Sequence, residues 1–339
     1  MVVSSGPRHE KERVNRMQHA TLGNTGIKVS KVCMGAMSFG GEADLDMSAR
    51  LFQRCREAGV NFFDTANVYK DGRSEEILGE LIATCRDEVV ITTKVGMSLG
   101  KVTSGGLSRR HIFQQVEQSL RRLRTDRIEV YFCHIFDPAV PVEVTLRAMD
   151  DLVRGGKVLH VGVSNWTAWQ IALALGDCRQ GNLAPIDVLQ PMYNLAKRTA
   201  EIEILPLAAD RRLGVITYSP LGGGLLSGKY APDRRDPQGR LSTNKMYQSR
   251  YRDPEGFRIA QRLTKYAAGC GVHPVTLAVA WVKSHPAVTA AIIGARNLQQ
   301  LEPSLAAGDY DMPPAQRDEI TALTPPVPPA HDRTEVTPR

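Results

Sequence analysis

Four side chains that could take part in one reaction stand at or just after the ends of short apolar segments. Asp64 ends the segment FFD, Lys94 ends VVITTK, His134 ends VYFCH, and Tyr69 follows Asp64 by five residues. Taken singly, each has a structural interpretation, for example a packed loop tyrosine or a core histidine. A buried charge is costly unless it is paired or faces a wet pocket. Three such endings on consecutive segments therefore indicate a shared site, with a salt bridge between Asp64 and Lys94.

The chemistry open to these four side chains together is proton donation to a substrate oxygen. A tyrosine has a pKa of about 10, and a nearby lysine ammonium is expected to lower the pKa of Tyr69 by stabilising its phenolate. Asp64 would hold the lysine charged, and His134 could donate a hydrogen bond to the same oxygen. Carbonyl reduction needs such a donor at a developing alkoxide. No side chain supplies a hydride, so a nicotinamide cofactor is expected at the same place.

The elements that must position these residues alternate along the chain. Eight short segments rich in Val, Ile and Phe are each followed by a longer amphipathic segment. The predicted strands are residues 32–36, 61–64, 89–94, 128–134, 158–163, 188–192, 215–218 and 290–294. The predicted helices are residues 46–58, 74–85, 108–124, 142–154, 167–178, 200–212, 255–268, 275–284 and 298–307. Eight units favour a closed α/β fold, the (β/α)8 or TIM barrel, whose reactive groups lie at the carboxyl ends of the strands.

The segments outside these units are short or irregular. Residues 19–22 and 27–30 flank the turn signal GNTG and predict a β-hairpin that could plug the bottom of the barrel. Residues 1–17 lack a long apolar core, so we expect a disordered leader and no secretory signal. The barrel is expected over residues 18–324 and an extended, Pro-rich tail over 325–339. Two long loops, 96–106 and 222–254, are expected to be functional or disordered.

The composition argues against several classes of function. Hydrophobic residues make up 42% and charged residues 23%, as in globular proteins, and no apolar run is long enough to predict a membrane span. The net charge is +7, with the arginines scattered over several segments, which argues against nucleic-acid binding. The cysteines form no CxxC pair and there is no HExxH motif, so we expect reduced thiols, a cytoplasmic location and no metal site.

The segments that carry the four residues resemble the aldo-keto reductase superfamily. FFDTANVY followed by GRSEEILG, then ITTKVG, DRIEVYFCH, VLHVGVSN, SPLGGGLLSGKY and IIGARNLQQLEPSL keep that family's order, over residues 18–305. The long 222–254 segment resembles the branch that includes bacterial aldo-keto reductases and potassium-channel β subunits. The resemblance implies a (β/α)8 barrel that binds NADP(H) in extended form. It also implies Asp64, Tyr69, Lys94 and His134 as catalytic residues, with Tyr69 as the acid in reduction.

The same resemblance implies a cofactor site built from several loops. Tyr218 would stack on the nicotinamide ring, and Arg296 and Gln300 would flank the adenosine 2′-phosphate. Taken without the resemblance, the glycines at 222–224 suit either a phosphate or a flexible loop, and Arg296 suits either a phosphate or a solvated surface. Because a 2′-phosphate needs a cation, we expect NADPH to be preferred over NADH. The implied cofactor-binding residues are Gly35, Met37, Asp64, Ser164, Asn165, Gln190, Tyr218, Ser219, Pro220, Leu221, Gly222, Gly223, Lys229, Arg240, Gly294, Ala295, Arg296, Gln300 and Ser304.

The expected substrate pocket is apolar and aromatic, which suits small-molecule aldehydes or ketones with hydrophobic bodies. Two places depart from the family's pattern. Pro303 and Ser304 replace an acidic residue and an asparagine, which puts the adenine contacts in doubt, and Ile135 replaces a residue that is often arginine or another polar or aromatic residue. The expected lining is Met37, Phe39, Tyr69, His134, Phe136 and Trp166.

The function expected from these observations is NADPH-dependent reduction of an aldehyde or ketone, as an aldo-keto reductase of class EC 1.1.1.-. Three alternatives stay open. One is a reductase of keto or enoyl nucleotide sugars, and another is an NADPH-binding redox-sensing subunit like the channel β subunits. The third is a non-redox barrel enzyme, such as an aldolase that uses Lys94 in a Schiff base. The sequence indicates neither the natural substrate nor the oligomeric state.

Overall fold

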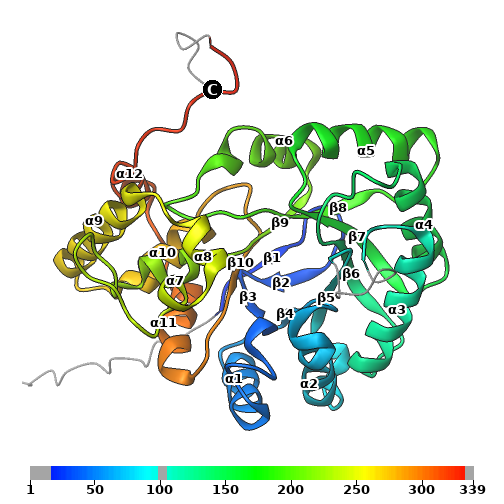
Figure 1. Cartoon of the computed structure of the whole chain (residues 1–339), viewed down its shortest axis with the longest axis horizontal. Coiled ribbons are helices and arrows are strands. Elements are labelled where there is room, and N and C mark those ends of the chain that lie inside the picture. The colour runs from blue at the N-terminus through cyan, green and yellow to red at the C-terminus, as the bar shows by residue number, and fades with distance from the viewer. Residues whose placement is uncertain (1–16, 98–104, 333–339) are drawn as a thin grey trace, which may run out of the picture.

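A computed structural model of the chain describes residues 17–97 and 105–332 (Figure 1). Residues 1–16, 98–104 and 333–339 lie outside the described residues, and with them most of the expected leader, part of the expected 96–106 loop and the end of the expected tail. Residue 17 does not belong to a leader, because Met17 is buried in the hydrophobic core.

Eight parallel strands close into a barrel in the order β10-β3-β4-β5-β6-β7-β8-β9, which confirms the predicted fold class. The strands are β3 (Val32–Gly35), β4 (Phe62–Asp64), β5 (Val90–Val95), β6 (Ile128–Cys133), β7 (Val158–Ser164), β8 (Ile186–Gln190), β9 (Gly214–Thr217) and β10 (Ala290–Ile293). The ring closes where β10 pairs with both β3 and β9. The predicted strand ends are displaced by one or two residues, so that His134 follows β6 directly.

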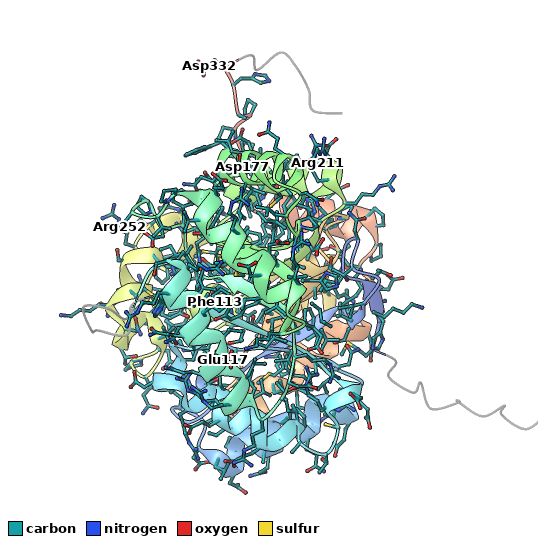
Figure 2. All side chains as sticks on the ribbon, turned by 90° about the vertical axis from the view of Figure 1, so that its right-hand side faces the viewer. Phe113, Glu117, Asp177, Arg211, Arg252 and Asp332 are labelled. Carbon is teal, nitrogen blue, oxygen red and sulfur yellow. The ribbon has the colours of Figure 1, made fainter. Side chains whose placement is uncertain are left out.

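Helices surround the ring of strands (Figure 1). They are α1 (Leu45–Glu57), α2 (Arg73–Ile82), α3 (Arg109–Leu123), α4 (Val142–Arg154), α5 (Ala168–Gln180), α6 (Ile204–Arg211), α9 (Pro254–Cys270), α10 (Pro274–Lys283), α11 (Leu298–Asp309) and α12 (Pro314–Thr321). Polar caps define several starts: Asp44 accepts a hydrogen bond from the Met47 amide at 2.9 Å before α1. Figure 2 looks onto the outer face of α3, where Phe113 and Glu117 lie. No helix in residues 17–97 and 105–332 is long and apolar enough to cross a bilayer.

The barrel interior is filled from below by the N-terminal hairpin, as predicted. Strands β1 (His19–Thr21) and β2 (Lys28–Ser30) pair antiparallel. Leu22 and Val29 are fully buried and belong to one apolar cluster with inward residues of the barrel strands. The contact with β9 is close: a Cβ added to Gly23 would lie 2.2 Å from the backbone nitrogen of Gly214. A hairpin at the bottom leaves the carboxyl ends of the strands as the open mouth of the barrel.

Two parts of the chain hold more helix than predicted. The expected loop over 222–254 contains the 3-10 turn η5 (Gly222–Ser227) and the short helices α7 (Arg240–Thr243) and α8 (Lys245–Arg250). Helix α12 was not expected at all. The other 3-10 turns are η1 (Ala36–Ser38), η2 (Tyr69–Gly72), η3 (Arg86–Glu88) and η4 (Thr199–Glu201). The 222–254 segment is therefore an ordered structure beside the mouth.

Candidate active site

The alternation of side chains along each strand selects which residues reach the mouth. In β4, β5 and β6 the inward apolar residues are Phe62, Val90 and Val130, and side chains two residues apart share one face. Continuing this period of two reaches Asp64, Lys94 and His134 at the carboxyl ends of the three strands. The same period in β8 runs from inward Val188 to Gln190, and in β9 from inward Ile216 to Tyr218. One rule of strand geometry therefore points these polar side chains into the mouth.

Asp64 and Lys94 form a buried ion pair, as the sequence predicts. The Lys94 Nζ lies 2.7 Å from Oδ1 and 2.6 Å from Oδ2 of Asp64, and it also donates to the Thr65 carbonyl at 2.7 Å. Thr92 and Gln190 donate to Asp64 Oδ1 at 2.6 and 2.9 Å. Burial alone would lower the pKa of Lys94, but the Asp64 carboxylate raises it above its ordinary value. Lys94 is thus a fixed cation, which argues against a Schiff-base role.

The ring of Tyr69 lies next to this ion pair. The Lys94 Nζ is 5.1 Å from the centroid of the phenol ring. Burial raises the pKa of Tyr69, the Lys94 charge opposes this increase, and the Asp64 charge adds to it; the net direction is upward. The expected net lowering by Lys94 was therefore wrong, because Asp64 neutralises the lysine and burial disfavours the phenolate. Tyr69 keeps its proton at neutral pH, as a proton donor must.

The turn that carries Tyr69 has an unusual backbone. Lys70 and Asp71 adopt the left-handed conformation with φ of 51° and 54°, which costs roughly 1–2 kcal/mol for a residue other than glycine. Lys70 is tied by an ion pair of 2.9 Å to Glu42. Gly72 follows with φ of 92°, and a Cβ there would lie 2.6 Å from the Arg122 guanidinium. Contacts from outside the turn therefore hold Tyr69 in place.

A buried carboxylate that sequence reasoning missed supports the same turn from behind. Glu75, the third residue of α2, is fully buried. It accepts hydrogen bonds from Thr93 at 2.6 Å and from Arg122 at 2.6 Å. Thr93 precedes Lys94 on β5, so Glu75 connects the helix that follows Tyr69 with the strand that carries Lys94. In the sequence Glu75 stands in the ordinary helical pair Glu75-Glu76, which gives no signal of burial.

His134 faces Tyr69 across the mouth. The two ring centroids are 5.9 Å apart with an interplanar angle of 80°. Burial, together with the Lys94 charge, lowers the pKa of His134 to about 3. Its Nδ1 is buried and has no hydrogen-bond partner in the part of the chain that the structure describes. The imidazole is therefore neutral at physiological pH and can donate one hydrogen bond without carrying a charge.

These pKa directions predict a flat pH profile for carbonyl reduction. The expected role of Tyr69 as the acid needs its proton, and its raised pKa keeps that proton bound through the neutral range. Activity is then lost only as pH rises through that raised value, whereas His134, with a pKa of about 3, adds no step near pH 6.5. The measurement is kcat/KM from pH 5 to 10, with His134→Asn as control. A step near pH 6.5 that vanishes in the control would contradict a neutral His134.

A chain of hydrogen bonds joins the residues expected around a nicotinamide. Ser164 donates to the Gln190 carbonyl at 2.9 Å, and Asn165 donates to Ser164 Oγ at 3.0 Å. Tyr218 donates to Asn165 Oδ1 at 2.7 Å. Asn165 has a left-handed φ of 59°, and its side-chain amide also holds the His134 carbonyl at 2.9 Å. The structure thus brings Ser164, Asn165, Gln190 and Tyr218 together beside the four candidate catalytic residues.

The segment after β9 forms the next part of the mouth. Ser219 is left-handed, with φ of 57°, and its carbonyl accepts a hydrogen bond of 2.8 Å from Asn194. Asn194 is fully buried and is a further residue that sequence reasoning missed. Gly222 and Gly223 have φ of 59° and 68°, which only glycine adopts at low cost. Pro220 is buried and Leu221 is half-buried.

Three basic residues of the expected cofactor set differ in their partners. Lys229 is paired with Asp236 at 3.7 Å, and Arg240 is paired with Glu42 at 3.6 Å. Arg296 follows β10 and makes no ion pair within the described residues, and its backbone nitrogen donates to Gln300 Oε1 at 3.2 Å. Of the three, Arg296 is the cation that could bind an anion without first breaking an ion pair with another residue of the described chain.

Three other residues of the expected cofactor set lie near β10. Gly35 ends the neighbouring strand β3, and Gly294 and Ala295 directly follow β10. A Cβ added to inward-facing Gly35 would lie 2.8 Å from Ile292, so packing requires that glycine. Gly294 is exposed, and Ala295 is buried with its carbonyl accepting from Ser38 at 2.7 Å. Ser304 does not line an open surface, because it is fully buried inside α11, and its hydroxyl has no partner in the described chain.

The expected pocket lining is corrected at one position. Phe39 is fully buried in the hydrophobic core and cannot contact a substrate without rearrangement. Phe136 and Trp166 pack edge to face with centroids 5.1 Å apart, and Met37 is partly exposed. Trp166, Asn165, Gln190 and Tyr218 also line a cavity of about 180 Å³, but Ile171, Leu189 and Ile204 line it too and Tyr69 and His134 do not, so it is not the expected substrate pocket. Ile135 is 44% exposed and stands at the surface.

Fold and site together define a barrel protein with a tyrosine next to a buried ion pair at its mouth. The sequence profile described as "Aldo/keto reductase family" matches residues 31–325. A probable voltage-gated potassium channel subunit beta of Oryza sativa subsp. japonica is 37% identical over 316 residues, 91% of this chain and 96% of that protein. An uncharacterized oxidoreductase, YrpG, of Bacillus subtilis (strain 168) is 35% identical over 311 residues, 87% of this chain and 92% of that protein. The chain belongs to the aldo/keto reductase family.

Proposed function

We propose that this protein is an NADPH-dependent oxidoreductase that reduces the carbonyl group of small aldehydes or ketones. The observation that carries the proposal is the position of Tyr69 above the buried Asp64–Lys94 pair, with the Lys94 ammonium 5.1 Å from its ring. Among ordinary side chains, a tyrosine is a poor acid at neutral pH unless its conjugate base is stabilised. The arrangement supplies that stabilisation at the moment the proton leaves.

In the proposed reaction each residue acts at a stated atom. When bound, NADPH supplies the hydride to the carbonyl carbon. The Tyr69 hydroxyl gives its proton to the carbonyl oxygen, and the Lys94 charge stabilises the phenolate that remains. The neutral His134 donates a hydrogen bond to the same oxygen and orients it. Asp64 keeps Lys94 charged and fixes its position, because both carboxylate oxygens accept hydrogen bonds from the ammonium.

The residues around the mouth fit such a cofactor. The half-buried ring of Tyr218 offers an apolar face, and Asn165 and Gln190 offer amide groups to a carboxamide. The left-handed glycines 222 and 223 allow the chain to turn closely beside the mouth, where a pyrophosphate would lie, with the rings of Tyr251 and Tyr247 packed against them. Arg296, which has no ion pair within residues 17–97 and 105–332, offers its guanidinium to a 2′-phosphate. These features support the proposed cofactor set without a dinucleotide-binding glycine motif.

The test of the proposal is NADPH oxidation, followed by absorbance, against a panel of aldehydes, ketones and sugar phosphates. We expect turnover with one substrate class and none without substrate. Tight binding of NADPH without turnover of any panel member would contradict the proposal. A nucleotide-sugar ketone in the same panel separates the sugar-reductase alternative from a general carbonyl reductase.

NADPH is expected to be used in preference to NADH. A charge-assisted hydrogen bond contributes roughly 1.5–3 kcal/mol, so Arg296→Ser is expected to lower kcat/KM for NADPH by roughly 10- to 100-fold. The same substitution should leave kcat/KM for NADH unchanged, which serves as the internal control. Equal catalytic efficiency of the wild type with both cofactors would show that no residue distinguishes NADPH from NADH by its 2′-phosphate.

A second candidate function has one observation in its favour. The rice relative, which matches over 91% of this chain, carries the name of a potassium channel subunit. We therefore also consider a regulatory subunit that binds NADPH and turns over slowly. Copurification with a membrane protein, together with slow turnover of every panel substrate, would favour this candidate over the reductase.

A further inference from the structure

Helix α5 presents an apolar face to the outside of the barrel (Figure 1). Trp169 and Leu173 are 62% and 61% exposed, the highest values among the large hydrophobic residues of the described chain. Ala172 and Gly176 are exposed on the same face, because residues three, four and seven positions apart lie together on a helix. The opposite face of α5 is already buried in the core. A helix that is apolar on both faces is expected to be covered on both, so a partner on the outer face is indicated.

Gly176 is a glycine that the fold of one copy of the chain does not require. It lies in the interior of α5, where glycine weakens a helix relative to alanine. Its φ is not positive, and a Cβ added to it would meet no described atom within 4 Å. Neither backbone conformation nor packing within the chain therefore explains it. A glycine on an exposed helix face does allow another chain to approach closely.

The outer face of α5 is complementary to itself in size. Trp169 and Gly176 are seven residues apart, which is two helical turns, and Ala172 and Leu173 lie midway between them. When two copies of α5 pack antiparallel about a two-fold axis at this midpoint, the large Trp169 of each copy lies over Gly176 of the other. The two Leu173 side chains then lie against each other. A face that meets its own copy in this way is the requirement of a two-fold interface.

The helices on either side of α5 surround this face with exposed charges of both signs. On α4, Glu143 pairs with Arg147 at 2.8 Å, and on α6, Asp210 pairs with Arg211 at 3.0 Å. Both helices contact α5. An apolar centre with a polar rim is the ordinary composition of a protein–protein interface.

We propose that the outer face of α5 binds the same face of a second copy of this chain and so forms a two-fold dimer. Trp169 and Leu173 form the centre of the interface, and Gly176 receives the indole of the second copy. The inference does not depend on the proposed reductase function, because association is measured without cofactor or substrate.

Sedimentation velocity of the full chain over a range of protein concentrations tests the dimer. We expect the wild type to dimerise and Leu173→Glu to raise the dimer dissociation constant at least about 30-fold, because two carboxylates would face each other in an apolar centre. Leu45→Glu is the matched control. Leu45 is 45% exposed on α1, which follows β3, and β3 lies across the ring from β7, the strand before α5. This control should dimerise like the wild type.

Gly176→Gln tests the same interface without a risk to the fold. Glutamine favours a helix more than glycine does, and the position is open in one copy. We expect circular dichroism to show an unchanged helix content. The dimer dissociation constant should rise roughly 10- to 100-fold, because the new side chain takes the place of Trp169 of the second copy. A folded Gly176→Gln that dimerises like the wild type would overturn the inference.

Quenching of tryptophan fluorescence by acrylamide locates the interface. Trp169 is the exposed one of three tryptophans, since Trp166 and Trp281 are buried, so acrylamide reports chiefly on Trp169. We expect quenching of the wild type to fall as the dimer forms, and Leu173→Glu to keep the quenching of the monomer. A wild type that stays monomeric at every concentration contradicts the inference, and so does a dimer in which Trp169 remains open to acrylamide.

Discussion

Replacing Tyr69 with phenylalanine is expected to reduce carbonyl turnover by roughly 100- to 10,000-fold while NADPH still binds. The substitution removes the hydroxyl that gives the proton in the proposed reaction, and it keeps the aromatic ring that packs against His134 at 5.9 Å. The measurement is kcat for the best substrate of the panel, with the NADPH dissociation constant measured in parallel.

Tyr247→Phe provides the matched control for that experiment. Tyr247 lies beside the same mouth and is buried, but the lysine ammonium is directed at Tyr69. We expect the control to keep most of its turnover. Full activity in Tyr69→Phe, or an equal loss in both variants, would remove Tyr69 from the role of acid.

Lys94→Met is expected to cost both stability and activity. Breaking a buried ion pair by removing one partner leaves the other charge uncompensated, at a cost of roughly 3–5 kcal/mol. Asp64 would then keep only the hydrogen bonds from Thr92 and Gln190. We expect urea unfolding to report this loss in the free energy of unfolding, and turnover to fall because no charge stabilises the Tyr69 phenolate.

The double variant separates the two effects. Asp64→Asn with Lys94→Met removes both charges, so its free energy of unfolding should lie above that of Lys94→Met alone, while its turnover stays low. Additive losses of stability would mean that the two side chains do not act as a pair. Recovery of turnover together with stability would show that Lys94 has a purely structural role.

Much of the architecture could be predicted because strand periodicity and strand ends are local properties. The eight alternating units predict the barrel, and the period of two carries from apolar Phe62 and Val90 to Asp64 and Lys94. What could not be predicted depends on contacts between distant segments. Nothing in the pair Glu75-Glu76 shows that Glu75 is the residue that meets Arg122, 47 positions away.

The helices of the 222–254 segment were missed for a related reason. Residues of α8 are held by tertiary contacts, such as Tyr247 against Gly223, and helices this short are not stable alone. The direction of the Tyr69 pKa was wrong because a sequence shows which charges are near but not how deeply the phenol is buried. Phe39 was misplaced in the pocket because an apolar loop residue can face either a ligand or the core.

The contact of the N-terminal hairpin with β9 has a consequence for how the chain folds. Leu22 and Gly23 are made early in synthesis, yet Gly23 packs on Gly214 in β9, and β3 pairs with β10 near the end of the chain. The hairpin therefore cannot make its contact with Gly214 until β9 has emerged. We expect ring closure and docking of the hairpin to come late in folding, because contacts of such long sequence separation lose loop-closure entropy before they gain contact energy.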